Sequence, residues 1–277
     1  MQPALELLFS HIDDIPRVPE VVKTLLDQVS DPDIDFKAVA SNIEKEQVLA
    51  IKVLRNVNSA HFGLRKRVSS IQEALTILGM HEIRKLVIVT GLAETLPYLP
   101  NIDLNDFWQD SFRTASYAKW IAEQAQLGHS EMIFTAGLIY DLGTILIHLG
   151  EPDAASDITE AVYQGQDRLD SERQYLGFTS HEACAELCRQ WQFPEELINT
   201  VEKSGEPMAY SQLSLSACAV HVARYVSQST YSDEGEDVLL QTFPMQEWQK
   251  LGLDKNSILS SMATMSKLET GLDGLLD

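Results

Sequence analysis

Apolar residues recur along this chain at helical intervals of three and four positions. Ile71, Ala74, Leu75 and Leu78 form one such series, and they would share one face of a helix. We find no sustained alternation of apolar and polar residues and no Asn-Gly hairpin sequence, the two patterns that indicate strands. The pattern therefore predicts an all-α protein.

One strongly apolar segment, residues 134–149, contains a single charged residue, Asp141. Asp141 falls on the same helical stripe as Phe134, Leu138 and Ile145, so the segment is predicted to be one continuous core helix with an acid on its buried face. A buried carboxylate is destabilising unless it is paired, hydrogen-bonded or bound to a metal. We therefore expect Asp141 to have a partner from elsewhere in the chain.

Other features favour a cytoplasmic protein that does not enter a membrane. Residues 134–149 are fewer than the about 20 apolar residues that a membrane span needs. No basic segment followed by an apolar run stands at the start of the sequence, where a secretion signal would lie. The three cysteines, Cys184, Cys188 and Cys218, are too few for a disulfide framework, and we expect them to be reduced.

Capping and turn residues predict where further helices begin and end. Asp35 and Asn105 are expected N-caps, and residues 70–73 read S-I-Q-E, the sequence of a capping box. Gly79 should end the helix that follows this box. Pro194 should occupy the first position of another helix.

A break bracketed by Pro97 and Pro100 divides the chain into two predicted lobes. The N-terminal helical lobe would contain residues 1–97, and the second helical lobe, with a C-terminal extension, residues 98–277. A length of 277 residues suits this division, because domains usually contain roughly 100–200 residues.

The charge of the chain is unevenly distributed. Its formal net charge is −20, but residues 45–85 carry +5 and the remainder carries −25. Duplex nucleic acid is not expected as a partner of so acidic a protein, since phosphate binding requires a cationic face. We do expect one local basic surface.

Several short motifs occur in a fixed order along the chain: Ile15-Pro16-Arg17-Val18-Pro19, Lys52-Val53-Leu54-Arg55, Asn58-Ser59-Ala60, Phe62-Gly63, Ser70-Ile71, Leu78-Gly79, Phe107-Trp108, Ala136-Gly137-Leu138, Asp141-Leu142-Gly143, Glu172, Gly177, Trp191 and Pro194. This series resembles the HDOD domain, a bacterial signalling output module, over about residues 10–210. The resemblance implies two helical lobes, the second related to the HD metal-dependent phosphohydrolases.

Those phosphohydrolases hold one or two metals with histidines and an aspartate. The resemblance places the corresponding cleft at Asp110, Tyr140, Asp141, Ser180 or its neighbour His181, Ser204 and Gly205. Asp141 is the one ligand that is securely kept, whereas a metal that activates water needs three or more suitable ligands. The resemblance thus implies a regulatory module with no catalytic residue, no metal and no cofactor.

An enzyme, a small-ligand sensor and a zinc site stay open as alternatives to this interpretation. Asp141 with His181 could support residual metal-dependent phosphohydrolysis, and the degenerate cleft could bind a nucleotide or another small ligand. His181, Cys184 and Cys188 share a helix face and could bind zinc. Buried cysteines used as small apolar residues are the stronger explanation of that spacing.

A signalling protein is the expected partner, and residues 55–85 are the predicted contact surface. This segment contains the positive zone of the chain and a basic turn that could orient an acidic partner. The candidate contact residues are Arg55, His61, Phe62, Arg65, Lys66, Arg67, Arg84 and Lys85.

Overall fold

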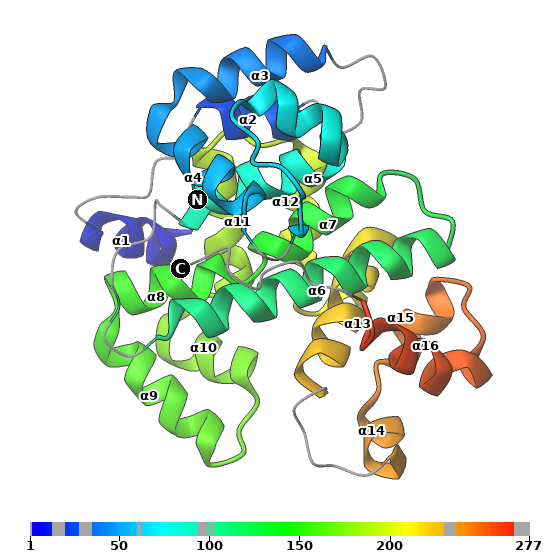
Figure 1. Cartoon of the computed structure of the whole chain (residues 1–277). Coiled ribbons are helices and arrows are strands. Elements are labelled where there is room, and N and C mark those ends of the chain that lie inside the picture. The colour runs from blue at the N-terminus through cyan, green and yellow to red at the C-terminus, as the bar shows by residue number, and fades with distance from the viewer. Residues whose placement is uncertain are drawn as a thin grey trace. The chain divides into compact units, whose positions relative to one another are not determined.

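The computed structural model describes residues 2–12, 20–27, 35–59, 62–93, 99, 102–229 and 236–268. Within these ranges every regular element is a helix and no strand occurs. The all-α prediction is therefore confirmed (Figure 1). The chain forms two compact units, a larger one from Met1–Ile15 and Leu99–Thr270 and a smaller one that includes Pro16–Tyr98.

The smaller unit contains α2 (Glu20–Asp27), α3 (Phe36–Lys45), α4 (Gln47–Val57) and α5 (Ile71–Ala93). Asp35 caps α3 as predicted, because its carboxylate accepts from the Lys37 backbone N–H at 2.9 Å. Inward residues of the helices make its core, among them Val39, Ile43, Val53, Val57, Ile71, Ile83 and Val87.

The start of α5 follows the predicted capping box with one difference. The Ser70 hydroxyl accepts from the Glu73 backbone N–H at 3.1 Å, as expected for an N-cap. The Glu73 carboxylate, however, accepts from the backbone N–H of Ser69 at 3.0 Å, one residue before the position that the box predicts. Gly79, with φ 80° and ψ 168°, divides α5 into two helical segments, at the residue where the sequence predicted an end.

In the larger unit, α7 and α8 pack against α6, α11 and α13, and α1 packs on α8 (Figure 1). The N-terminal helix thus belongs with this unit; the predicted division at residues 97 and 98 stays a prediction. The helices of the unit are α1 (Pro3–His11), α6 (Leu104–Gln124), α7 (Ser130–Ile139), α8 (Leu142–Gly150), α9 (Pro152–Tyr163), α10 (Arg168–Leu176), α11 (Ser180–Gln190), α12 (Glu195–Lys203), η2 (Pro207–Ala209), α13 (Leu215–Ser229), α14 (Glu236–Thr242), α15 (Met245–Lys250), η3 (Lys255–Ser257) and α16 (Ile258–Met265).

The prediction of one continuous helix over residues 134–149 is wrong. A turn at Tyr140 and Asp141 separates α7 from α8, and the backbone of Asp141 has ψ 5°, outside the helical range. The apolar stretch Ser130–Gly150 is long and apolar enough to span a membrane, but 83% of its 18-residue apolar window is buried inside the protein. These helices therefore form the core of the larger unit.

Two predicted helix starts are displaced. Asp103, and not Asn105, caps α6, because its carboxylate accepts from the backbone N–H groups of Asn105 and Asp106. Pro194 is the N-cap of α12 and not its first residue. The helix α10 was absent from the sequence-based prediction altogether.

Candidate functional site

The partner of Asp141 comes from α10. Asp141 is half-buried, and its carboxylate accepts from the Thr144 hydroxyl at 2.6 Å. Arg168 Nη2 donates to that hydroxyl at 3.2 Å. Burial disfavours the charge of Arg168, but the carboxylates of Asp141 and Glu172 outweigh this effect and raise its pKa. The predicted partner of Asp141 is thus Arg168, which is linked to the carboxylate by the Thr144 hydroxyl.

Glu172 fixes the Ser180 position of the cleft. Its side chain is fully buried and accepts from Arg168 Nε at 2.9 Å, the Ser180 backbone N–H at 2.7 Å and the Ser180 hydroxyl at 3.0 Å. The carboxylate therefore lies at the N-terminus of α11, where a negative charge is favourable. The Ser180 hydroxyl donates its proton within the protein.

Gly143 allows α8 and α11 to pack closely together. A Cβ atom at this position would lie 1.7 Å from the Ser180 carbonyl oxygen and 3.0 Å from the Cys184 backbone nitrogen. Only glycine allows α8 and α11 to approach this closely. The Asp141-Leu142-Gly143 motif therefore positions Asp141 close to the first turn of α11.

Asp110 and Tyr140 belong to a second hydrogen-bonded group. Asp110 accepts from the Ser227 hydroxyl at 2.7 Å, from Arg113 Nη2 at 3.2 Å and from the Tyr140 hydroxyl at 3.3 Å. Tyr140 is buried, and burial together with the charge of Asp141 raises the pKa of its phenol. Tyr140 therefore stays neutral and acts as a hydrogen-bond donor.

Ser204 and Gly205 form a turn that is hydrogen-bonded to α13. The Ser204 hydroxyl donates to the Val201 carbonyl at 2.8 Å, and His221 Nδ1 donates to the Ser204 carbonyl at 2.9 Å. This turn holds Gly205 beside His181, where an added Cβ would lie 2.9 Å from His181 Nδ1.

His181 differs from these residues because neither of its ring nitrogens has a hydrogen-bond partner. Its side chain is 2% exposed. Burial, followed by the positive charge of Arg224, lowers the pKa of His181 well below its usual value. The ring is therefore neutral at physiological pH.

The side chains at these positions do not fit a divalent metal. Over the described ranges no three His, Cys, Asp or Glu side chains gather in a ligand arrangement. The three cysteines are free and buried; Cys184 donates to the Ile139 carbonyl at 3.0 Å, and burial raises the pKa of its thiol. A zinc site needs deprotonated thiolates, so the face shared by His181, Cys184 and Cys188 does not favour one.

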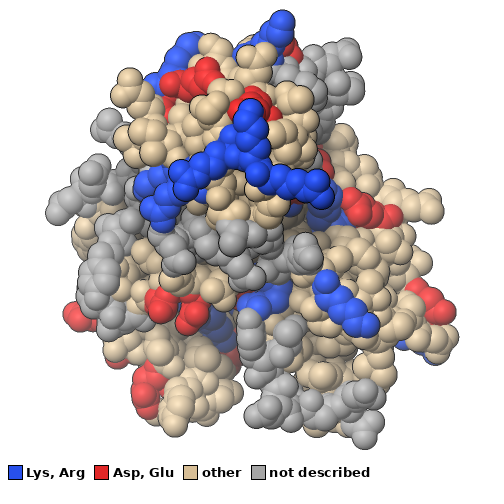
Figure 2. Space-filling model, viewed as in Figure 1, with Lys and Arg blue, Asp and Glu red and all other residues tan. Residues whose placement is uncertain are grey.

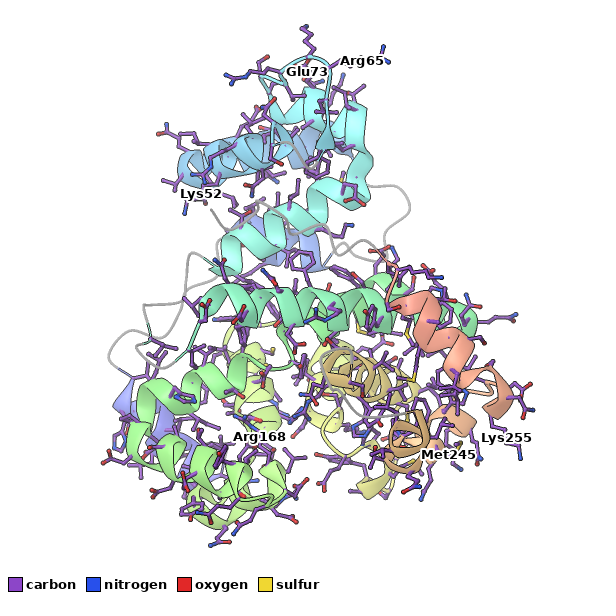
Figure 3. The ribbon with its side chains drawn as sticks, turned by 60° about the horizontal axis from the view of Figure 1, so that its bottom comes forward. Lys52, Arg65, Glu73, Arg168, Met245 and Lys255 are labelled. Atoms are coloured by element: carbon purple, nitrogen blue, oxygen red, sulfur yellow. The ribbon has the colours of Figure 1, made fainter. Side chains whose placement is uncertain are left out.

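Sequence reasoning missed two arginines of the cleft, Arg168 and Arg224. Figure 3 shows Arg168 among the green helices, on their side toward the yellow helices. Arg224 on α13 lies with its guanidinium carbon 5.8 Å from the centre of the Tyr140 ring. The sequence did contain a signal for Arg168, because Arg168 and Glu172 are spaced by one helical turn and can form an ion pair. No local pattern marks Arg224.

The outer face of α4 in the smaller unit combines apolar and basic residues. Val48 and Ile51 are 61% and 67% exposed. Lys52 and Arg55 are exposed on the same helix at helical spacing from them. Ile51 also lines a groove of about 340 Å³ between the end of α3, one side of α4 and the start of α5. We refer to this face, the groove and the loop of residues 65–67 as the α4 surface.

The basic loop beside this helix has a fixed base. Asn58 donates to the Val68 carbonyl and accepts from the Val68 backbone N–H, both at 2.8 Å. Arg65, Lys66 and Arg67 are exposed between these anchors. Figure 2 shows a group of blue side chains across the upper part of the molecule, and Figure 3 shows Lys52 and Arg65 directed outward.

The other predicted contact residues have different surroundings. Lys85 forms an ion pair with Glu82 at 2.7 Å, and Phe62 is half-buried. His61 and the side chain of Arg84 lie outside the described residues. The exposed candidates are thus Arg55 and the three residues of the loop.

Comparison with known families gives one match over most of the chain. A model of the HDOD domain matches residues 15–207. A Treponema pallidum (strain Nichols) protein of no assigned function is 26% identical over 263 residues, which are 91% of this chain and 50% of that protein. This chain therefore spans half the length of that relative. The YuxH protein of Bacillus subtilis (strain 168) is 32% identical over 70 residues, 25% of this chain and 17% of its own length.

Solved structures share the fold. A Shewanella amazonensis SB2B protein, provisionally named a phosphohydrolase, is 28% identical with a TM-score of 0.78, and the match covers 98% of both chains. An HDOD domain protein of Geobacter sulfurreducens is 21% identical with a TM-score of 0.73 over 96% of this chain and 98% of its own. A protein of Marinobacter aquaeolei VT8, provisionally named for signal transduction, is 17% identical with a TM-score of 0.78 over 100% of this chain and 61% of its own.

Proposed function

Since this chain belongs to the HDOD family, we propose that it is a non-catalytic signal-transduction module that acts by binding a protein partner. One observation carries this proposal. At the cleft positions Asp110, Asp141, Ser180 and Ser204, the polar side chains are engaged in hydrogen bonds within the protein. These side chains support the fold of the larger unit and leave few ligand atoms for a metal that would activate water.

The partner would bind the α4 surface. Large aliphatic side chains exposed together on one helix face are typical of interaction sites. Fully burying such a side chain contributes about 1.5–3 kcal/mol. Because Val48 and Ile51 are 61% and 67% exposed, a partner that covers them would gain roughly 1–2 kcal/mol from each.

Charge selects the kind of partner. Arg55 lies one helical turn from Ile51 on α4, and Arg65, Lys66 and Arg67 are exposed in the loop anchored to the end of that helix. An acidic amphipathic helix of a signalling protein fits both features, since its apolar side would cover Val48 and Ile51 and its carboxylates would meet the cations. At physiological salt the charge of the acidic remainder is screened beyond about 8 Å, so the local basic zone decides contact.

The test is a charge reversal of the loop. The chain with Arg65→Glu, Lys66→Glu and Arg67→Glu together should capture much less partner from native cell extract than the parent, and the remaining capture should depend less on salt. Its Tm should stay nearly unchanged, because the three side chains are exposed. The captured partner is identified by mass spectrometry and its binding is then measured with purified protein.

A matched control reverses three exposed lysines of the larger unit, Lys250, Lys255 and Lys267. Lys255 is visible in Figure 3. This variant has the same change in net charge and should capture the partner normally. If the loop variant captures the partner as well as the control does, the interface lies elsewhere, most simply on the larger unit.

Phosphohydrolase activity is the second candidate, because the 28% identical Shewanella protein carries that provisional name. In that case Asp141 and His181 would be the ligands. Metal analysis of protein purified without chelators and hydrolysis assays on cyclic dinucleotides and nucleoside phosphates test it. Metal-restored activity that disappears in Asp141→Ala would support this candidate over the first.

A further inference from the structure

Unpartnered polar atoms of the larger unit gather around Tyr140. Among the described residues, the buried side-chain nitrogen and oxygen atoms that lack a hydrogen-bond partner are Thr114 Oγ1, His181 Nδ1, His181 Nε2 and Arg224 Nε. They come from three helices, α6, α11 and α13. Buried polar groups are paired in nearly all folded proteins, so a cluster of four unpaired atoms indicates a site for a polar ligand.

Tyr140 connects the three residues. The His181 ring lies 6.2 Å from the Tyr140 ring, and the Arg224 guanidinium lies over the Tyr140 ring at 5.8 Å. The Thr114 hydroxyl lies near the Tyr140 hydroxyl and partly opposes the rise of its pKa, without the geometry of a full hydrogen bond. The hydroxyl of Tyr140 itself donates to Asp110. The unpaired atoms thus surround one buried aromatic ring.

Charges of both signs act at this cluster. Beyond burial, the carboxylates of Asp141 and Asp110 raise the pKa of Tyr140 and Arg224 opposes this rise, but both carboxylates accept hydrogen bonds from other residues. After burial, the strongest influences on His181 are the positive charge of Arg224 and the neighbouring His221, followed by Arg168 and Arg173. Arg168 is hydrogen-bonded to Glu172 and Arg173 to Glu206. The described contacts of Arg224 include no ion pair. A metal cation would be repelled by this guanidinium, whereas an oxyanion would be attracted to it.

We infer that Thr114, His181 and Arg224 form a binding site for a small tetrahedral oxyanion of the phosphate type. The Arg224 Nε–H, the Thr114 hydroxyl and one protonated nitrogen of His181 would donate to phosphate oxygens. The second nitrogen of neutral His181 would accept from a phosphate hydroxyl. Both a free phosphate ion and a phosphomonoester group that retains a proton offer this set of donors and acceptors.

Gly205 leaves the Nδ1 side of the His181 ring without a side chain. An added Cβ would lie 2.9 Å from His181 Nδ1 and 3.2 Å from its Cε1 atom. The glycine at this position therefore lets the backbone approach the ring closely, and Gly205→Ala provides a steric variant that keeps all three polar side chains. The site is in the larger unit and does not depend on the partner surface proposed above.

Calorimetric titration of the full chain with inorganic phosphate, at constant ionic strength and with chloride as the reference, tests the inference. We expect saturable binding that is weakened at least tenfold in Arg224→Gln and unchanged in Arg189→Gln, whose guanidinium pairs with Glu202 on the surface. Ring nitrogen NMR signals of His181 should shift on phosphate addition. A parallel titration with a nucleoside monophosphate distinguishes a free ion from a phosphomonoester as the preferred ligand.

No saturable binding of either probe would overturn the site, as would binding that Arg224→Gln leaves unchanged. If Arg224→Gln does not fold, Gly205→Ala replaces it, and unchanged binding in that variant would have the same meaning. Saturable binding that shifts no His181 signal would also place the ligand elsewhere. Binding of the monophosphate but not of free phosphate supports the site as one for a larger phosphate-bearing ligand.

Discussion

Gly143→Ala should destabilise the larger unit, because the new Cβ would lie 1.7 Å from the Ser180 carbonyl oxygen. Carbon and oxygen atoms rarely approach closer than about 3.3 Å, so α8 and α11 would have to separate by roughly 1.6 Å. The obstructing atoms belong to the backbone of α11, at Ser180 and Cys184, and cannot rotate away. The packing of both helices must therefore change.

The net effect combines two terms. Overpacking a well-packed interior costs about 1–3 kcal/mol, and the backbone contact puts Gly143→Ala at the upper end. Replacing a helical glycine with alanine stabilises the helix by about 1 kcal/mol, because alanine has the higher helix propensity. The net loss is about 2 kcal/mol, which corresponds to a fall in Tm of about 4–8 °C for a unit of this size.

Two further glycines supply the controls. Gly137→Ala would place its Cβ 2.9 Å from the Ala115 Cα atom, a milder conflict, and Gly128→Ala would meet nothing within 4 Å. Thermal unfolding should therefore rank Gly143→Ala below Gly137→Ala and Gly128→Ala, with the last close to the parent. Amide hydrogen exchange at Ser180, whose N–H donates to Glu172, should accelerate in Gly143→Ala. A Tm within about 1 °C of the parent would refute the described approach of the two helices.

Three other changes test the site and the loop. Asp141→Ala should lower the free energy of unfolding by about 1 kcal/mol. This is the low end of the cost of a lost hydrogen bond, because Asp141 is half-buried. Denaturant titration measures the change, and an unchanged unfolding midpoint would count against a structural role of Asp141. Burial lowers the pKa of His181, so the unfolded chain binds more protons. Stability should therefore be full above about pH 6.5 and fall as the pH drops below it, and His181→Asn should reduce this slope. Asn58→Ala removes both hydrogen bonds to Val68 and should speed proteolytic cleavage in the basic loop, while Asn42→Ala on α3 should not.

Local signals predicted much of the fold. Asp35 needs only its neighbour Lys37 to cap α3, and Ser70 needs only Glu73 to begin α5. The apolar stripe of Ile71, Ala74 and Leu75 is buried as expected. Each of these features is decided within one or two helical turns, which is the range that a sequence pattern describes.

Tertiary contacts explain what the sequence did not reveal. The break at Asp141 lies beside the close approach of Gly143 to Ser180, 37 residues later in the chain. Periodicity alone could not show it, since the apolar stripe continues across the break. Asp141 was expected on a fully buried face, yet the turn leaves it half-exposed, with its partner on α10, a helix whose many polar residues gave no apolar stripe.

Arg168 supplies the positive charge that faces the carboxylate of Asp141. A carboxylate beside the core of a protein needs a nearby positive charge or hydrogen-bond donors, and here Arg168 and Thr144 supply both to Asp141. A guanidinium stays protonated at physiological pH and donates in a fixed fork. It can therefore balance the charge of Asp141, but it offers no open coordination position and cannot lower the pKa of a bound water as a metal does. Replacing Arg168 with Gln should on this argument lower the Tm of the larger unit, whereas adding divalent metal to the parent should not raise it.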